Sequence, residues 1–370
     1  MKFFVSIFFC VLGVLQNVIN AQGNNLPNPQ LSRGRCRNRV VRKEVTSMTR
    51  QEWNDFANAN VMLHNAGYFE GLAKIHDDYA MAIHGNGFFF PWHRRFVKHY
   101  EMLLQSMNRN VVVPYWDWTR NWQNPETNPV LSNRFMGGNG VGGGNCVRDG
   151  LIHDWDRSFP TQDCVKRGFR QGNTPGPFWP MDAVLRVLQS SNDFRTFSTN
   201  IENGPHGNVH LGIGLDFQEM HAPNDPLFFL HHGMVDRIWS IWQAQNPRIA
   251  NDITSNDIDG NPISPDTLLP FYNEPISSSV FDGSSGYCYT YDDLATRSLE
   301  EFINKDDMRS RLKSQLGSVL PICNSTITEG YFPSVKPDTN HFMFAPNITA
   351  RDQMNNLVRN EVLNILNCRV

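Results

Sequence analysis

Seven of the twelve histidines fall into two groups whose chemistry suits metal binding. The first histidine group contains His76, His84 and His93, and the second histidine group contains His206, His210, His231 and His232. An imidazole nitrogen is a common metal ligand, and six neutral imidazoles without a thiolate favour copper over zinc or calcium. Three such ligands to each ion leave coordination positions open for oxygen. The histidines therefore predict two copper sites.

Within the second histidine group, His206 and His210 are four residues apart, so on a helix they share a face about 6 Å apart. This spacing alone is a weak signal, because pairs of surface histidines are its commoner cause. A zinc-protease motif requires Glu directly after the first histidine, and Gly207 occupies that position. His231 and His232 are about 100° apart around a helix, so both cannot point at one ion. One is expected to be a ligand, and the other to pack or form a hydrogen bond nearby.

In the first histidine group, His84 and His93 lie in the segment HGNGFFFPWHRRF. The Pro-Trp pair before His93 predicts a helix that begins at this histidine, with His84 reaching in from the preceding loop. On one continuous helix His76 and His84 would be about 12 Å apart, which is too far for one ion. The chain is therefore expected to leave the helix between them, near Ala82.

Two amphipathic helices are predicted to position these histidines. The first starts near Trp92 and continues along an apolar stripe of Phe96, Val97, Tyr100, Leu103, Leu104 and Met107. The second starts at Asp225 and Pro226, an N-cap and a first-turn residue of favourable type. Its stripe contains Leu227, Leu230, Met234, Ile238, Ile241 and Trp242. The predicted fold is mainly α, a helical bundle with long loops and few short strands.

Asp236 follows His232 by about one helical turn. Two interpretations of this carboxylate remain open. It could orient an imidazole from outside the metal's own ligands, or it could form an ordinary surface salt bridge.

Three segments resemble the copper-binding signatures of the tyrosinase and catechol oxidase family, which is related to molluscan haemocyanin units. They are HGNGFFFPWHRRF, PYWDW at residues 114–118, and HGNVH followed by NDPLFFLHHGMVDRIW. CYTYDD resembles the tyrosine motif that closes the family's catalytic domain, so the resemblance runs from about residue 35 to residue 291. It implies a four-helix bundle with two copper ions between two helix pairs.

The resemblance also implies roles for individual residues. The two coppers would be bound by His76, His84 and His93, and by His206, His210 and His232. His64 is a rival of His76, but the segment KIHDDY around His76 resembles the family's first ligand segment. A bulky side chain that overhangs the second copper corresponds to Phe217. A carboxylate that holds a water near the copper corresponds to Glu202.

The implied activity is oxidation of o-diphenols to o-quinones with molecular oxygen, with weaker action on monophenols. Family members that hydroxylate monophenols well have an Asn where this chain has Gly207. The expected partners are oxygen and a small phenol or catechol, or tyrosyl and dopa residues of proteins. Two alternatives remain: a structural matrix protein with weak or no turnover, and an oxygen carrier like a haemocyanin unit.

The composition is that of a globular protein, with 40% hydrophobic and 19% charged residues. A net charge of −3 gives no electrostatic reason to expect nucleic acid or anionic membrane as a partner. Lys2, the apolar run that follows it and Ala21 predict a signal peptide over residues 1–21. We expect residues 22–300 to form the dicopper domain and residues 301–370 to form an extension of unknown role.

The cysteines agree with secretion. Six remain after the predicted leader: Cys36, Cys146, Cys164, Cys288, Cys323 and Cys368. An even number in an oxidising compartment predicts three disulfides, with fifteen possible pairings. Glycosylation sequons at Asn324 and Asn347 also suit an extracellular protein.

Overall fold

The fold is mainly helical, as predicted. A computed structural model describes residues 26–31, 36, 39–280 and 286–292. Its helices are α2 (Arg50–Asn65), α3 (Tyr68–Asp78), α4 (Ala80–Ile83), α5 (Phe89–Met107), α6 (Met181–Ser190), α7 (Phe194–Ile201), α8 (Gly207–Ile213) and α9 (Leu227–Gln245). A π-helical segment, Glu202–His206, joins α7 to α8, and short 3-10 turns at Leu215–Gln218 and Ala222–Asn224 precede α9.

Strands are few and short in the described residues. β1 (Val40–Arg42) pairs in parallel with β6 (Tyr289–Tyr291), Val40 opposite Tyr289. The antiparallel pairs are β2 (Asp156–Arg157) with β3 (Asp163–Cys164), and β4 (Ser255–Asn256) with β5 (Pro262–Ile263). The predicted leader and the predicted extension lie outside the described residues, with both sequons, Cys323 and Cys368.

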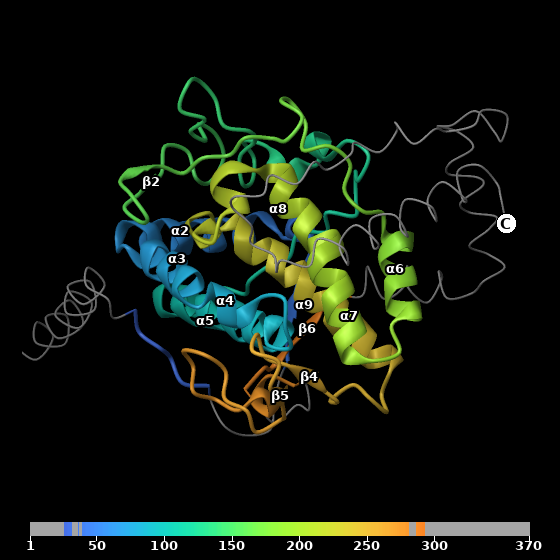
Figure 1. The fold of residues 1–370 in the computed structure, drawn as a ribbon. Coiled ribbons are helices and arrows are strands. Elements are labelled where there is room, and N and C mark those ends of the chain that lie inside the picture. The colour runs from blue at the N-terminus through green and yellow to red at the C-terminus, as the bar shows by residue number, and fades with distance from the viewer. Residues whose placement is uncertain (1–25, 32–35, 37–38, 281–285, 293–370) are drawn as a thin grey trace, which may run out of the picture.

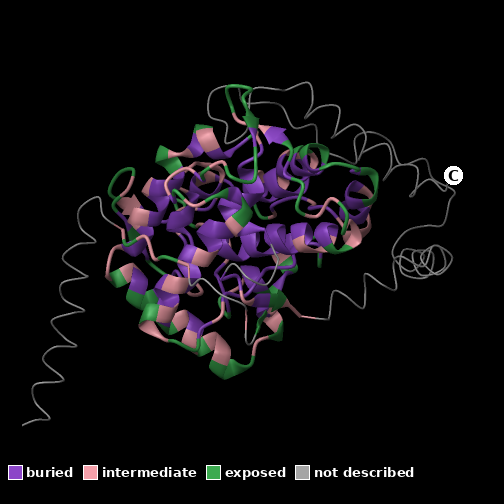
Figure 2. Ribbon diagram, turned by 90° about the horizontal axis from the view of Figure 1, so that it is seen from below, coloured by how far each residue is buried: buried purple, intermediate pink, exposed green. Residues whose placement is uncertain are grey.

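Helices α5 and α9 pack against each other at the centre of the molecule. Every residue of α9 from Leu227 to Trp239 is buried, a pattern typical of a helix surrounded by protein on all sides. Figure 2 shows buried residues concentrated in the central helices and exposed residues mainly at the periphery. Aromatic rings fill much of this core, and Tyr100 of α5 stacks on Phe229 of α9 with centroids 3.9 Å apart.

Helix α5 begins at Phe89, earlier than the predicted start at His93. The Asn86 side chain accepts a hydrogen bond from the Phe88 amide at 2.9 Å, and the Trp92 amide donates to the Phe88 carbonyl at 2.9 Å. A proline can follow in the first turn, because amides there have no intrahelical partner. His93 therefore lies in the second turn of a formed helix rather than at its start.

The start of α9 follows the predicted capping. Asp225 Oδ1 accepts a hydrogen bond from the Leu227 amide at 3.0 Å, and the Asp225 carbonyl accepts one from Phe228 at 2.9 Å. The carboxylate is also bound by Arg167 through Nε and Nη2, at 2.7 and 3.0 Å. Both sides of this ion pair are buried, so the cap is fixed from outside the helix.

The chain leaves the helix between His76 and His84, as predicted, but not at Ala82. The break is at Tyr79, whose φ and ψ are −105° and 4°, and Ala82 lies inside the short helix α4. The chain becomes extended at His84, with φ and ψ of −118° and 152°. These two departures bring the His76 and His84 rings together despite their spacing, with centroids 5.0 Å apart.

Asp236 fits neither interpretation made from the sequence, because it is buried in an ion-pair network. It accepts hydrogen bonds from Arg94 Nε at 2.5 Å, from Tyr289 Oη at 2.5 Å and from Tyr291 Oη, and pairs with Arg42 at 3.5 Å. These partners belong to α5, β6 and β1. Asp236 therefore joins the two ends of the domain to its central helices and bonds no histidine among the described residues.

Two of the three predicted disulfides are present in the described part of the chain. Cys36 pairs with Cys288, and Cys146 pairs with Cys164, at sequence separations of 252 and 18. The first joins the segments that flank β1 and β6, so it reinforces the closure that Asp236 makes from inside. The third disulfide stays a prediction, because Cys323 and Cys368 lie outside the described residues.

The disulfide that closes the longer loop should contribute more to stability. A cross-link removes chain entropy from the unfolded state, and this loss grows with loop length. The double change Cys36→Ser and Cys288→Ser should lower the free energy of unfolding by about 5.5 kcal/mol. The double change Cys146→Ser and Cys164→Ser should lower it by about 3 kcal/mol. Urea unfolding of both double variants measures this. An equal or smaller loss for the longer loop would contradict the entropic explanation.

None of the helices in the described ranges combines the length and the apolar character needed to cross a membrane.

Candidate metal centre

The structure brings both histidine groups together in the core. Within each group, one ring nitrogen from every member lies within 4.8 Å of the others, and all these histidines are buried. The first histidine group comes from α3, the end of α4 and α5, and the second from the π-helical segment, α8 and α9. The groups meet where the His93 and His232 rings stack with centroids 4.4 Å apart.

Backbone carbonyls orient the rings. The Nδ1 atoms of His84, His93 and His206 bond to the carbonyls of Ala80, Phe89 and Glu202, each four residues earlier, at 3.0, 2.7 and 3.0 Å. His76 and His210 instead reach the carbonyls of Met220 and Phe217, at 2.6 and 2.5 Å. A carbonyl can only accept, so Nδ1 carries the proton and Nε2 keeps its lone pair. Five histidines thus present Nε2 as a ligand atom.

Burial keeps these imidazoles neutral. It lowers the pKa of His84 to about 4 and that of His210 to about 3. It also takes the pKa values of His76, His93, His206 and His232 well below the usual range, helped by neighbouring histidines. Near neutral pH the side chains are uncharged, which is the form that binds a metal.

The donor atoms fit copper. Within the described residues, Nε2 of His84 and His210 and both ring nitrogens of His232 are buried without a hydrogen-bond partner. Buried polar atoms are rarely left unpaired, so these nitrogens are suited to act as ligands to a metal ion. The donors are all imidazole nitrogens, with no carboxylate or thiolate in either group, a set that suits copper.

His231 and His232 differ in how they meet the other rings. His232 lies between the groups, stacked on His93, with its centroid 5.0 Å from that of His206. His231 stacks nearly parallel on His206 at 5.2 Å, meets the His210 ring edge-on at 4.7 Å, and lies 6.3 Å from Trp118. A ring nitrogen of each lies within 4.8 Å of ring nitrogens of His206 and His210, so His232 as the ligand stays a prediction.

Glu202 lies between the two groups. Its carbonyl bonds His206, and its Oε1 accepts a hydrogen bond at 2.7 Å from the amide of Gly85, the residue after His84. The side chain is buried, and burial raises the pKa of this carboxyl to about 8. A carboxyl with a pKa near neutrality suits proton transfer.

Phe217 has no exposed surface. Its ring packs on the His210 ring with centroids 4.9 Å apart, while its carbonyl holds the same histidine. The side chain therefore backs His210, and contact with a substrate would require the surrounding loop to open. The predicted overhanging role stays untested.

His64, the rival of His76, belongs to neither group. It lies on α2, stacked on Trp155 with centroids 4.1 Å apart, and its Nε2 bonds the Asp156 carbonyl at 2.9 Å. His221 lies in the loop before α9 and bonds Asp216 at 3.3 Å. His99 is buried and bonds the Pro27 carbonyl at 2.7 Å, outside both groups.

Sequence reasoning missed the kink that places Glu202 and His206. Gly204 has φ and ψ of −92° and −106° inside the π-helical segment, and a Cβ there would lie 2.9 Å from the Trp179 ring. Such π-helical insertions often occur at functional sites. The Gly-Pro pair at residues 204–205 was the available signal, because this pair interrupts a regular helix.

The fold and site define a helical protein with two adjacent all-histidine sites. A family model described as the common central domain of tyrosinase matches residues 50–245, more than half of the 370-residue chain. The chain belongs to the tyrosinase family. The family implies a dicopper centre, and the two histidine groups are where this chain could hold it.

Individual relatives agree with this membership. The chain is 29% identical over 289 residues to a tyrosinase of Aspergillus flavus, an alignment that covers 69% of this chain and 80% of the relative. It is 26% identical over 277 residues to a tyrosinase of Streptomyces antibioticus, covering 68% and 99%. Among solved structures, a polyphenol oxidase of Thermothelomyces thermophila superposes with a TM-score of 0.57 at 22% identity, covering 68% and 88%. That structural likeness supports the helical fold.

Proposed function

We propose that this protein is a secreted dicopper oxidase that uses molecular oxygen to oxidise o-diphenols to o-quinones. The observation that carries the proposal is the meeting of two buried, neutral histidine groups at His93 and His232. His76, His84 and His93 would hold one copper, and His206, His210 and His232 the other. Bound copper would supply oxygen binding and electron transfer from the phenol.

Apolar side chains surround the contact between the two histidine groups and exclude water from it. The Phe89 ring lies 4.8 Å from both His93 and His206, and the Phe228 ring lies 5.0 Å from His76 and 4.2 Å from His232. Both phenylalanines are buried. An apolar surrounding keeps the imidazoles unprotonated and limits loss of an oxidised product to water.

Glu202 is our candidate for moving the phenol proton. Oε1 accepts a hydrogen bond from the Gly85 amide, which leaves Oε2 to accept the proton, directly or through one water, whenever the carboxyl is ionised. Glu202 contacts both histidine groups: its backbone carbonyl bonds His206, and its side chain bonds the amide of Gly85, the residue after His84. This connection supports a role at the substrate between the two coppers.

Secretion forms part of the proposal. The two disulfides support it, because such bonds persist mainly in oxidising compartments. The substrate would then be an extracellular small phenol or catechol, or tyrosyl and dopa residues of proteins.

The test is reconstitution of the purified chain with copper. We expect two coppers per chain, an absorption band that appears on oxygenation, and oxygen uptake with a simple catechol. A band without catechol oxidation would support an oxygen carrier. No copper binding, or bound copper with neither band nor turnover, would support a structural role and overturn the proposal.

We predict weaker activity on monophenols than on diphenols. A monophenol must lose its proton at the site, and Gly207 offers no side chain to help Glu202 orient a water. One missing hydrogen bond of about 0.5–1.5 kcal/mol corresponds to roughly a 2- to 12-fold slower step. Gly207 has helical φ and ψ of −62° and −33°, which asparagine can also adopt. Gly207→Asn should therefore raise the ratio of tyrosine hydroxylation to dopa oxidation.

The ratio of initial rates on tyrosine and dopa measures this effect. Phe217→Leu serves as the comparison, since the bulky side chain near His210 is the rival determinant. A wild type that acts equally fast on both substrates, or a Gly207→Asn variant with an unchanged ratio, would show that this position does not set the preference.

A further inference from the structure

One loop accepts hydrogen bonds from both histidine groups. The Phe217 carbonyl accepts from His210 Nδ1 at 2.5 Å, and the Met220 carbonyl accepts from His76 Nδ1 at 2.6 Å. Both carbonyls belong to residues 214–221, between α8 and α9. The orientation of one imidazole in each group therefore depends on the shape of this loop.

The loop contains one short 3-10 turn, Leu215–Gln218, and enters it through an unfavourable backbone conformation. Leu215 has a positive φ of 49°, which is sterically unfavourable for a residue with a side chain. Gly214 has a φ of 72°, and a Cβ there would lie 2.2 Å from the Gly168 carbonyl oxygen. Such a conformation persists only when surrounding contacts fix it.

Asp216 provides those contacts. Its Oδ2 accepts hydrogen bonds from Arg157 Nε at 2.8 Å and from the Lys166 amide at 3.0 Å. Its Oδ1 accepts from Arg157 Nη2 at 3.2 Å and lies 3.3 Å from His221 Nε2. The side chains of Asp216 and Arg157 are each only 7% exposed, so solvent does little to screen this bidentate pair.

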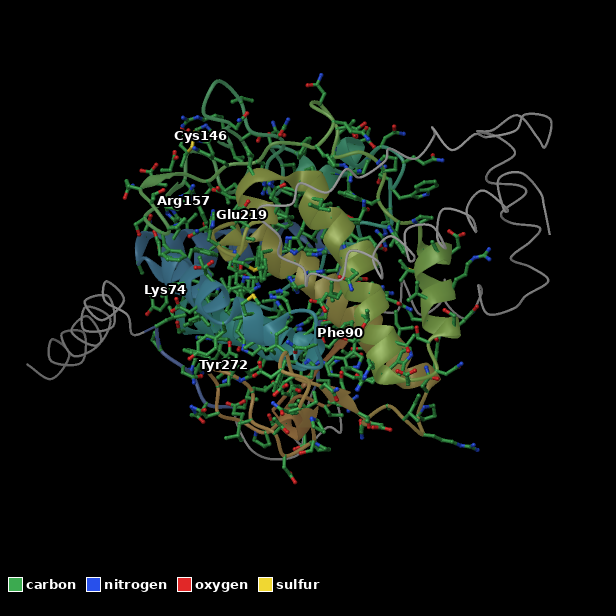
Figure 3. All side chains as sticks on the ribbon, viewed as in Figure 1. Lys74, Phe90, Cys146, Arg157, Glu219 and Tyr272 are labelled. Atoms are coloured by element: carbon green, nitrogen blue, oxygen red, sulfur yellow. A yellow bond between two sulfur atoms is a disulfide. The ribbon has the colours of Figure 1, made fainter. Side chains whose placement is uncertain are left out.

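Arg157 is itself fixed by a cross-linked hairpin. It lies on β2, opposite Asp163 of β3, and its Nη1 donates to the Thr161 carbonyl at 2.7 Å. The adjacent Cys164 is bonded to Cys146. In Figure 3, Arg157 and Glu219 of the loop are labelled on the same side of the molecule. The chain of contacts thus runs from the hairpin through Arg157 to the loop.

We propose that Asp216, held by Arg157, is a positioning residue that aligns His76 and His210, one imidazole in each metal site. The proposal rests on the copper function proposed above. It assigns the pair no contact with substrate, oxygen or copper. Its distinctive consequence is that one substitution outside both histidine groups should weaken metal binding in both sites together.

The test uses Asp216→Asn, which keeps the shape of the side chain but turns one of its two acceptors into a donor. Glu274→Gln is the matched control, because it disturbs a partly buried pair of the same bidentate kind, in which Arg95 bonds both Glu274 oxygens at 2.8 and 2.9 Å. No carbonyl of that segment bonds a histidine of either group among the described residues. Arg157→Lys is the milder variant, since lysine keeps the charge without the bidentate geometry.

Each metal-free variant is titrated with Co²⁺, whose visible absorption reports ligand geometry without oxidase turnover. In a second experiment each variant is loaded with copper, and a competing chelator measures how tightly the copper is held. We expect Asp216→Asn to weaken both sites by about 10- to 100-fold and to change the Co²⁺ spectrum, the usual effect of losing a partner behind metal ligands. Arg157→Lys should give a smaller change in the same direction. Glu274→Gln should lower the unfolding temperature and leave both metal readouts unchanged.

Wild-type affinity for both metals separates the possible failures. A wild type that binds neither Co²⁺ nor copper would contradict the proposed function itself. A wild type that binds two ions, with Asp216→Asn and Arg157→Lys equal to it in affinity and spectrum, overturns only the positioning role. Loss of one site alone, or an equal loss in Glu274→Gln, also overturns it, because the first excludes a shared loop and the second indicates general destabilisation. Should Asp216→Asn not fold, Arg157→Lys decides by the same criteria.

Discussion

His232→Ala is expected to remove one of the two coppers and to lower catechol oxidation by about 1000-fold, equivalent to about 4 kcal/mol of transition-state stabilisation. His232 stacks on His93 at 4.4 Å, so it lies where the two histidine groups meet. Loss of this imidazole would leave the second copper with two ligands.

His231→Ala is the matched control, because it removes an equally buried imidazole from the adjacent position. His231 stacks on His206 of its own group, whereas His232 stacks on His93 of the first histidine group, so we expect both coppers to remain in His231→Ala and activity to fall about tenfold or less. Copper content by atomic absorption and catechol oxidation rates distinguish the variants. If His231→Ala loses copper and His232→Ala keeps it, the two roles are reversed. His64→Ala should change neither quantity.

The metal-free protein is expected to lose stability steeply as the pH falls below about 6.5. Burial lowers the pKa of eight histidines in the described residues: His76, His84, His93, His99, His206, His210, His231 and His232. In the unfolded chain they titrate near the ordinary value of 6.5. The unfolded state therefore binds more protons below that pH, which favours unfolding.

The sign and the window follow from these shifts. The stabilising contribution is fully present above about pH 6.5 and is lost as the pH falls toward the folded values, about 4 for His84 and about 3 for His99 and His210. Each histidine should lower the free energy of unfolding by about 1 kcal/mol between pH 6.5 and about pH 5.5. Together they should cost several kcal/mol, and bound copper should shift the loss to lower pH, since it binds only the neutral imidazoles.

Urea unfolding of the metal-free chain at several pH values measures this effect. His99 is buried away from the metal site. His99→Gln should therefore reduce the slope of the unfolding free energy against pH by the amount that corresponds to about one proton. Stability that is constant between pH 7 and pH 5 would contradict the prediction.

The sequence determined which histidines to consider and the kind of helices that carry them. Helical periodicity and capping are local, so the spacing of His206 and His210 and the capping of α9 by Asp225 could be read directly. The break between His76 and His84 could also be anticipated, because a continuous helix keeps them too far apart. Its place at Tyr79 depended on packing and could not.

Only the tertiary structure decided what lies behind the histidines. The carbonyl of Met220 that holds His76 is 144 residues away in sequence, and Arg157 is 59 residues from Asp216. From the sequence, Asp236 could be a surface or a metal-site carboxylate. In the structure it is buried and bonds residues of α5, β1 and β6, so it joins both ends of the domain to the central helices. Residue types and local spacing specify ligands and helices, whereas hydrogen bonds between distant segments depend on how the whole chain packs. For that reason the ligand candidates were visible in the sequence and the residues that orient them were not.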